Sequence, residues 1–435
     1  MSTTFVDKLG ASPAVNSRST ASHVFLKIKQ PITEDSVPQP RIFEAGRKYV
    51  FPFTFVVPEQ TLPRPCPHGV ANEHIHQAHH QLPPSLGDPE LAGFTGKLLD
   101  DLAPEMAKIS YAIKVRMSRM KEVDGKEVMV ADQSRKIRIK PAFTEQPPMN
   151  ISEQDDEFRL RQEKSVKKGM FSGKLGRLVM ETVQPRSFHL PTAPADGSIV
   201  PVTTMAKVTL RFDPAEETSP PPRLSSLSSR LKVSTFYAST GRSNFPTKKQ
   251  MIFDANQGMY NISLPLSSRC MASVKWERHQ PEKPSSESGL QRRDSGIDMS
   301  GTPLPSSAYK DGVFYTATIL VPLTLPTNKH IVPTFHSCLI SRTYSIAMDL
   351  SIHGQGISSP SLTLKVPVQV SDEGNVAAVE RRASQQEEEQ ILTEFAPRSI
   401  APPQDEYLSV GSSMAPPEYE VFASTGRGLG VSVAA

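Results

Sequence analysis

The sequence has 435 residues, 40 of them proline, and only 37% are hydrophobic. The length allows two or three domains, but this composition indicates that part of the chain does not pack into a core. The 49 Lys and Arg residues nearly balance 45 Asp and Glu residues, and the formal net charge of +4 is too small to predict a nucleic-acid partner.

Neither a membrane span nor a disulfide framework is expected from the sequence. No stretch approaches the ~18 consecutive apolar residues of a transmembrane helix, and the start MSTTFVDKLGASPAV lacks the basic and then apolar pattern of a secretion signal. The three cysteines, Cys66, Cys270 and Cys338, are too few and too widely spaced for a disulfide framework, so we expect free thiols in a reducing compartment. We therefore predict a soluble, cytoplasmic protein.

Period-two patterns of apolar residues predict antiparallel strands along most of the chain. The first covers residues 49–57, where Tyr49, Phe51, Phe53, Phe55 and Val57 share one face. A second alternating run covers 109–117, and Asp124-Gly125 follows it at a spacing suited to a hairpin turn. Further strands are predicted at 206–212, 231–238, 313–323, 344–352 and 362–370. Helical periodicity is scarce, so the pattern favours an all-β fold of sandwiches.

Three segments have the composition of disordered chain: residues 1–22, 277–307 and 372–435. The middle segment interrupts a region rich in predicted strands, so we expect it to be a long surface insertion, which loop-closure entropy tolerates. The folded parts are then predicted to be residues 23–145 and 158–371.

Several segments resemble the fungal α-arrestins, which are arrestin-related trafficking adaptors. The resemblance begins with EAGRKYVFPFTFVVPEQTLPRPCPH, a Gly-Arg-x-Tyr strand start followed by Phe-Pro-Phe, and continues with Leu-Pro-Pro-Ser at 82–85. The segments 163–178, 333–352 and 361–370 are similar to strands of that family's C-terminal sandwich, so the resemblance covers about 23–371. It implies two arrestin-like antiparallel β-sandwiches. The first would be incomplete, because only about one strand precedes Phe51.

The resemblance also implies a function. Proteins of this family are scaffolds that bind the cytosolic regions of membrane transporters or receptors and a HECT-type ubiquitin ligase. We therefore expect an adaptor that promotes ubiquitination, endocytosis and down-regulation, present in the cytoplasm and transiently at the plasma membrane or endosomes. An arrestin-like signalling scaffold for pH or nutrient sensing is the alternative.

A PPxY motif is formed by Pro416, Pro417 and Tyr419. Its prolines favour a polyproline II conformation that docks on the aromatic groove of a WW domain, and the tyrosine fills a second pocket. The nearby segment 402–407 has two prolines and a tyrosine at the wrong spacing, which is typical of a spacer. The motif predicts a WW-domain ligase as partner.

Ser295 and Ser384 each follow a pair of arginines at the spacing of basophilic kinase sites. Phosphorylation there would add negative charge in predicted disorder and could create a docking site for 14-3-3; ordinary solvated charge is the alternative. A basic run holds Lys164, Lys167, Lys168 and Lys174. By resemblance these lysines are candidates for ubiquitination, although such a run could also attract anionic lipids or be merely a solvated face.

Five histidines, His68, His74, His76, His79 and His80, lie close to Cys66 in the sequence. Nitrogen and sulfur donors in such number suggest a zinc site, but no Cys-x-x-Cys pair accompanies them and the resemblance implies no metal. We interpret them as a histidine-rich surface loop and predict no metal and no cofactor.

Catalytic motifs are absent from the sequence: there is no glycine-rich phosphate loop, no Gly-x-Ser-x-Gly and no His-Glu-x-x-His. Together with the all-β prediction, this argues against an enzyme. A β-sandwich enzyme or carbohydrate-binding module is a further alternative, but sugar binding usually depends on exposed aromatic residues, and the sequence has a single tryptophan, Trp276.

Overall fold

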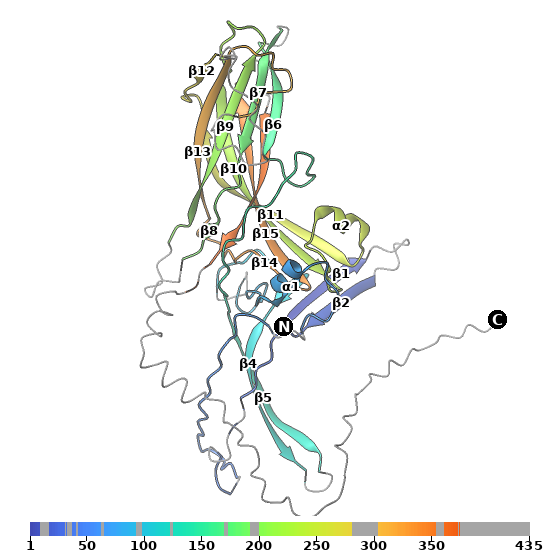
Figure 1. Ribbon diagram of the computed structural model, residues 1–435. Coiled ribbons are helices and arrows are strands. Elements are labelled where there is room, and N and C mark those ends of the chain that lie inside the picture. The colour runs from blue at the N-terminus through green and yellow to red at the C-terminus, as the bar shows by residue number, and fades with distance from the viewer. Residues whose placement is uncertain are drawn as a thin grey trace, which may run out of the picture. The chain divides into compact units, whose positions relative to one another are not determined.

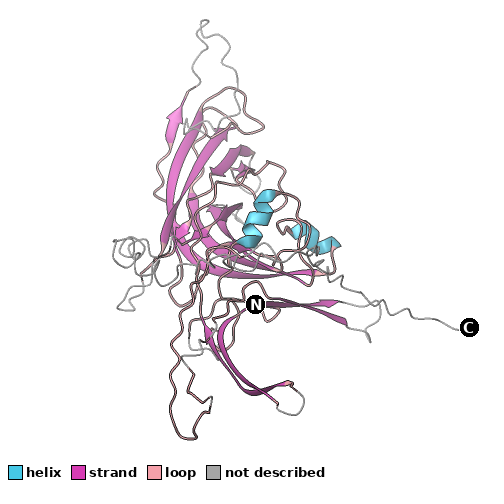
Figure 2. Ribbon diagram, turned by 60° about the horizontal axis from the view of Figure 1, so that its bottom comes forward, coloured by secondary structure: helices cyan, strands magenta, loops and turns pink. Residues whose placement is uncertain are grey.

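The structure is a computed structural model, and it describes residues 1–8, 17–30, 32, 37–40, 42–61, 65–92, 98–121, 125–168, 173–191, 200–280, 303–353, 361–372 and 374. Strands dominate these residues, which confirms the all-β class (Figure 2). The two helices, α1 (Glu73–His80) and α2 (Lys248–Phe253), are short. Among the described residues, no helix has the length and apolar character that crossing a bilayer demands.

Two five-stranded antiparallel sheets contain most of the strands (Figure 1). In one sheet the order is β11-β10-β15, and both β14 and β16 pair with the other edge of β15. Its strands are β10 (Leu224–Ala238), β11 (Gln257–Cys270), β14 (Phe335–His336), β15 (Ile340–Ile352) and β16 (Ser361–Val368). The other sheet has the order β12-β13-β9-β7-β6. Its strands are β6 (Arg161–Lys167), β7 (Lys174–Thr182), β9 (Thr203–Pro214), β12 (Glu277–His279) and β13 (Phe314–Thr324).

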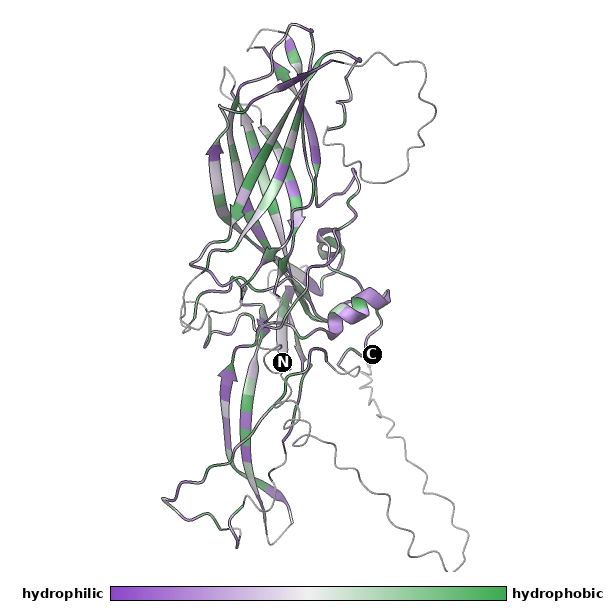
Figure 3. Ribbon diagram, turned by 60° about the vertical axis from the view of Figure 1, so that its left-hand side comes forward, coloured by the Kyte–Doolittle hydropathy of each residue, from purple (hydrophilic) through white to green (hydrophobic). Residues whose placement is uncertain are grey.

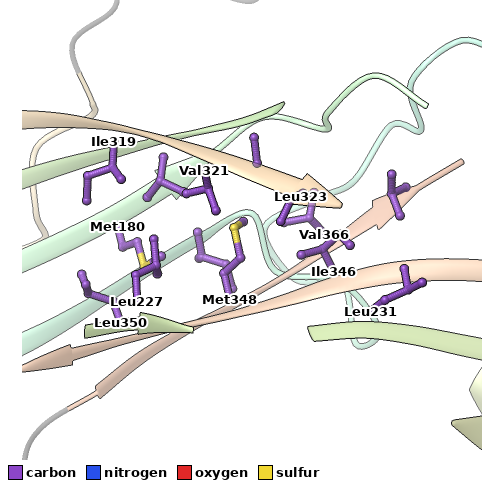
Figure 4. Close-up of a cluster of buried hydrophobic side chains, with 14 of the residues drawn as sticks. Met180, Leu227, Leu231, Ile319, Val321, Leu323, Ile346, Met348, Leu350 and Val366 are labelled. Carbon is purple, nitrogen blue, oxygen red and sulfur yellow. The ribbon is translucent and has the colours of Figure 1, made fainter. Parts of the chain in front are cut away.

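The inner faces of these two sheets share one hydrophobic core, because alternate residues of each strand point inward. On β16 the buried residues are Leu362, Leu364, Val366 and Val368, and they belong to the same cluster as Ile319 and Val321 of β13. Figure 4 shows side chains of both sheets meeting in this core. Burying one such side chain contributes about 1.5–3 kcal/mol. The strands predicted at 206–212, 231–238, 313–323, 344–352 and 362–370 fall on β9, β10, β13, β15 and β16.

The prediction that residues 1–22 are disordered is wrong for 2–8 and 17–22, while 9–16 lie outside the described residues. The structure places β1 (Ser2–Lys8) and β2 (Ser17–His23) in that segment, paired along their whole length, and β1 also pairs with β3 (Ala107–Ile109). The polar sequence of β2 offers no alternating pattern, so composition alone suggested a loop. Pairing with β1 overrides that local signal.

The predicted hairpin is confirmed as β4 (Tyr111–Met120) and β5 (Glu127–Ile137). Gly125 has the left-handed φ of +61° that the turn requires, while Asp124 lies outside the described residues. The hairpin carries exposed apolar side chains, for example Val115 between Lys114 and Arg116. Figure 3 shows both hydrophilic and hydrophobic residues along its strands. Pairing alone therefore holds most of its length.

The strand predicted at 49–57 is not formed, since those described residues take part in no β-ladder. Val50 is 75% exposed, and the backbone N–H of Thr54 donates to the side chain of Gln30 at 2.8 Å. An alternating pattern predicts a strand only where a neighbouring sheet edge is available for pairing. The described part of residues 23–145 therefore contains β3, the β4–β5 hairpin and α1, and no pair of facing sheets.

The insertion predicted at 277–307 is shorter than expected at both ends. Glu277–His279 form β12, which pairs with β13, and Pro303 and Ser306 are bonded to Arg211 and Asp213 of β9 at 3.1 and 2.8 Å. The remaining residues, 281–302, lie outside the described part of the chain, as does the tail from 375 to 435.

Contacts group residues 1–376 into one compact unit. Besides the core between the two sheets, a second buried cluster joins N-terminal residues such as Phe25, Cys66 and Leu86 to Phe335 and Cys338. A parallel pair, β8 (Phe188–His189) and β17 (Val370–Ser371), completes the described strands. The second cluster contains the candidate site.

Candidate metal centre

Four side chains with metal-binding atoms lie close together: Cys66 and Cys338, which belong to the second cluster, and His68 and His79. One ligand atom from each lies within 4.8 Å of all the others. The Sγ atom of Cys66 is 3.4 Å from Nε2 of His68 and 3.8 Å from Nδ1 of His79. Cys66, His79 and Cys338 are buried, and His68 is half-buried.

Helix α1 positions His79. The side chain of Asn72 caps the helix by accepting a hydrogen bond from the N–H of Ile75 at 3.0 Å. Ile75 and His79 are four residues apart, so they share one face of the helix, and both are buried. At the other end, the N–H of Thr61 donates to the carbonyl of His80 at 2.7 Å. These contacts fix the helix at both ends.

Cys338 lies at the tip of the tight turn that joins β14 to β15. The N–H of Ser337 donates to the carbonyl of Ile340 at 2.9 Å, and the Ser337 hydroxyl donates to the same carbonyl at 2.8 Å. The chain after β10 passes beside this turn, because the N–H of Arg242 donates to the Cys338 carbonyl at 3.1 Å. A thiol from the two-sheet part is thereby brought to donors from residues 66–79.

Gly241 lies directly against the ring of His68. A Cβ atom at position 241 would lie 2.5 Å from Cδ2 and 2.6 Å from Cγ of that ring. The other ring nitrogen of His68, Nδ1, is 3.3 Å from the carbonyl oxygen of Gly69. The ring is thus held between a glycine surface and a carbonyl acceptor, which directs Nε2 toward Cys66.

A buried cation lies next to the cluster. Arg242 is 3% exposed, and its Nη2 donates to the hydroxyl of Ser341 at 3.1 Å. Its Nε and Nη1 atoms have no hydrogen-bond partner among the described residues. Burial lowers the pKa of Arg242 to about 9, whereas Cys338 acts in the opposite direction. The positive charge of Arg242 would therefore stabilise a thiolate at Cys338.

Burial sets the protonation of two of the four groups. It lowers the pKa of His79 to about 3, so the imidazole is neutral and its lone pair is available at neutral pH. Burial also raises the pKa of the Cys338 thiol to about 12, and the neighbouring Cys66 adds to this shift. A metal ion that bound here would displace the thiol protons.

The interpretation of the histidines as a surface loop is wrong for His79 and His80, which are buried. His79 and His80 are 5% and 7% exposed. Cys338, which is far from the histidines in the sequence, completes the group of four donors with Cys66, His68 and His79. The ring of His80 contacts residues outside the cluster, since its Nδ1 is 3.1 Å from the Thr61 hydroxyl and its Nε2 is 3.0 Å from Nε2 of His76. His74 instead contacts the ring of Phe245. The Cys66-x-His68 spacing was the available sequence signal.

The other predicted site residues lie either outside the described part of the chain or at or near the edge of a sheet. Pro416, Pro417, Tyr419, Ser295 and Ser384 lie outside the described residues. The four lysines all have exposed side chains at or near one edge of a sheet: Lys164 and Lys167 on β6, Lys168 just after it, and Lys174 at the start of β7. Lys168 pairs with Glu216 at 2.8 Å. Charged side chains on an edge strand oppose pairing with other chains.

The four-residue cluster is the only group of three or more such donors found among the described residues that could hold a metal ion. No protein-family model matches the chain, and a search of the curated proteins finds no match either.

Proposed function

We propose that this chain is a non-enzymatic adaptor of the α-arrestin kind, which recruits a WW-domain ubiquitin ligase of the HECT type to membrane-protein cargo. The observation that carries the proposal is the PPxY motif of Pro416, Pro417 and Tyr419. The motif follows the compact unit, which ends at Val376. Such an order gives an adaptor one part for cargo and a separate part for the ligase.

The physical chemistry of the motif suits this role. Pro416 and Pro417 restrict φ to about −65°, so little conformational freedom is lost when the peptide docks. Tyr419 supplies an aromatic anchor for a small interface, where one buried ring provides a large share of the contact. Affinity is expected on the order of micromolar, because the contact is small and the flanking chain must become ordered.

The all-β fold also supports the proposal, but only at the level of fold class. The segments that resemble α-arrestin strands, 163–178, 333–352 and 361–370, fall on β6 and β7, on β14 and β15, and on β16. Fold alone does not fix function. The alternative of a carbohydrate-binding module is weakened because Trp276, the single tryptophan, packs against the hydrophobic core.

The adaptor would act in the cytoplasm and transiently at the plasma membrane or endosomes, where it promotes ubiquitination and endocytosis of transporters or receptors. Phosphorylation of Ser384, and of Ser295, would recruit 14-3-3 and shield the tail. The exposed lysines Lys164, Lys167, Lys168 and Lys174 are the candidate sites for ubiquitination of the adaptor itself.

Binding of the full-length chain to an isolated WW domain from a HECT-type ligase tests the proposal. Tyr419→Ala should abolish binding in calorimetry, while Tyr407→Ala, in the segment with the wrong spacing, should leave the dissociation constant unchanged. Glu418→Ala should also matter little, because the motif leaves that position unspecified.

Equal binding by wild type and Tyr419→Ala, or no binding to any such WW domain, would remove the support for ligase recruitment. The arrestin-like signalling scaffold would then be the better description. Ubiquitination of cargo in cells gives a second readout, since an adaptor requires Tyr419 for it and a scaffold does not.

A further inference from the structure

We propose that Cys66, His68, His79 and Cys338 bind one structural Zn²⁺ ion. The site is formed by residues that are far apart in the sequence, and it does not depend on the PPxY motif or on ligase recruitment. A zinc ion here would join the segment that contains α1 to the turn between β14 and β15.

The distances fit a tetrahedral ion. Zinc lies about 2.3 Å from cysteine sulfur and about 2.0–2.1 Å from histidine nitrogen, so sulfur and nitrogen ligands of one ion are roughly 3.6 Å apart. The Sγ of Cys66 lies 3.4 Å from Nε2 of His68 and 3.8 Å from Nδ1 of His79. The remaining separations are all within 4.8 Å, which small side-chain rotations would close.

The donor set favours zinc over other common ions. Two thiolates and two imidazoles form the tetrahedral S₂N₂ set of structural zinc sites, whereas Mg²⁺ and Ca²⁺ require oxygen ligands. None of the four donors of the cluster is a carboxylate. Because the protein supplies four ligands and three of them are buried, no position remains open for water or substrate. This indicates a structural ion rather than a catalytic one.

The surroundings of the cluster also fit a metal site. Ligating histidines commonly donate their second ring nitrogen to a carbonyl or carboxylate, and Nδ1 of His68 lies 3.3 Å from the carbonyl of Gly69. The buried guanidinium of Arg242 is next to Cys338 and has two nitrogens without partners among the described residues. Those N–H groups are available to a thiolate sulfur.

Two other chemistries could occupy the same four side chains. Cys66 and Cys338 could be linked by a disulfide, although both are free thiols in this structure. The thiols and imidazoles could also form ordinary hydrogen bonds without an ion. Both are outcomes of the test, and either one would contradict the proposal.

The test uses the full-length protein, expressed with zinc in the medium and purified under argon. Elemental analysis should find about one zinc per chain. Replacing zinc by Co²⁺ should give sulfur-to-cobalt charge transfer and the intense visible bands of tetrahedral coordination. Cys66→Ser and Cys338→Ser should each lose the bound zinc, whereas Cys270→Ser, at the exposed cysteine, should retain it. His74→Ala is the matched histidine control and should also retain it.

Thiol counting on the wild type keeps the test valid even where a variant fails to fold. A thiol reagent should modify Cys270 at once and Cys66 and Cys338 only after a chelator removes zinc. The proposal is overturned if the wild type carries no zinc and gives no tetrahedral cobalt spectrum, or if its mass without reductant shows Cys66 and Cys338 oxidised to a disulfide.

Discussion

Substitution of Gly241 by alanine is expected to displace His68 from the zinc site while leaving all four proposed ligand residues in the sequence. In the structure, the added Cβ would lie 2.5, 2.6 and 3.0 Å from Cδ2, Cγ and Nε2 of the His68 ring. Carbon atoms in contact are about 3.5–4.0 Å apart. The ring must therefore move by roughly 1 Å, because the opposing atom is a new backbone-anchored methyl group.

A movement of that size is large for a metal ligand. Zinc–ligand distances in proteins vary by about ±0.2 Å, so a ring displaced by roughly 1 Å cannot keep its bond unless the loop around His68 also moves. Changes in the groups that orient a ligand typically weaken metal binding about 10- to 100-fold. That range corresponds to about 1.4–2.8 kcal/mol of binding free energy. Overpacking would also destabilise the metal-free protein by about 1–3 kcal/mol.

Zinc affinity is measured by competition with a coloured chelator, and the folded state of each protein is checked by circular dichroism. Gly69→Ala is the matched control, because Gly69 follows His68 in the chain and the substitution keeps its carbonyl group. The added Cβ would meet nothing within 4 Å, and the φ of Gly69 is not left-handed. This control should bind zinc as the wild type does. The reasoning is refuted if Gly241→Ala, correctly folded, binds zinc with the affinity of the wild type, or if Gly69→Ala weakens binding as much.

Two further predictions concern stability. Leu350→Ala should lower the free energy of unfolding by about 2–5 kcal/mol, because Leu350 is fully buried between the sheets. Leu320 on β13 is 58% exposed, so Leu320→Ala should change that free energy by less than about 0.5 kcal/mol. Equal denaturant midpoints for the two variants would contradict the assigned core. Burial, together with Arg138, Lys140 and Arg342, lowers the pKa of His330 to about 3 from 6.5, so the unfolded chain takes up a proton below pH 6.5 that the folded chain refuses, and stability is lost between pH 6.5 and 3. His330→Gln should therefore lose less stability than the wild type between pH 7.5 and 5.5, by about 1.4 kcal/mol. The prediction fails if urea titrations give the two proteins the same dependence of unfolding free energy on pH.

Period-two patterns predicted the strands well wherever a strand has one face in a core. The segments 344–352 and 362–370 alternate clearly, and both have buried inner faces in β15 and β16. The hairpin was predicted from alternation and the turn chemistry around Gly125, even though most of its length is exposed. In these elements, local sequence and tertiary packing favour the same structure.

The failures occur where local sequence and tertiary pairing disagree. The segment 49–57 alternates as strongly as any in the chain, yet it pairs with no neighbouring strand in the structure. Conversely, the polar β2 has no apolar face but pairs with β1 through seven residues. Backbone pairing depends on whether a sheet edge is available, and a single sequence does not carry that information.

The candidate site was half visible in the sequence. Cys66, His68 and His79 are close together in the chain, but no helix was predicted there. That Ile75 and His79 share a buried helical face is seen only in α1. Cys338 belongs to a turn far along the chain, so only the fold brings it to the other three. Without that fourth donor, a solvated loop was the simpler interpretation.

A zinc ion would explain how the N-terminal segments stay attached to the two-sheet part. Apart from helix α1, the described part of residues 42–92 contains no strand and pairs only through isolated bridges such as Gln60–Gln81 and Leu86–Ile109. Ordering each residue nevertheless costs about 1–2 kcal/mol of conformational entropy. The second cluster, to which Leu82, Leu86 and Phe335 belong, has fewer buried apolar residues than the core between the two sheets. Where a core is too small to order its segments, a structural metal commonly supplies the missing free energy. The ligands of this site come from both sides of that cluster, so zinc would stabilise a junction that few of the described backbone pairs support.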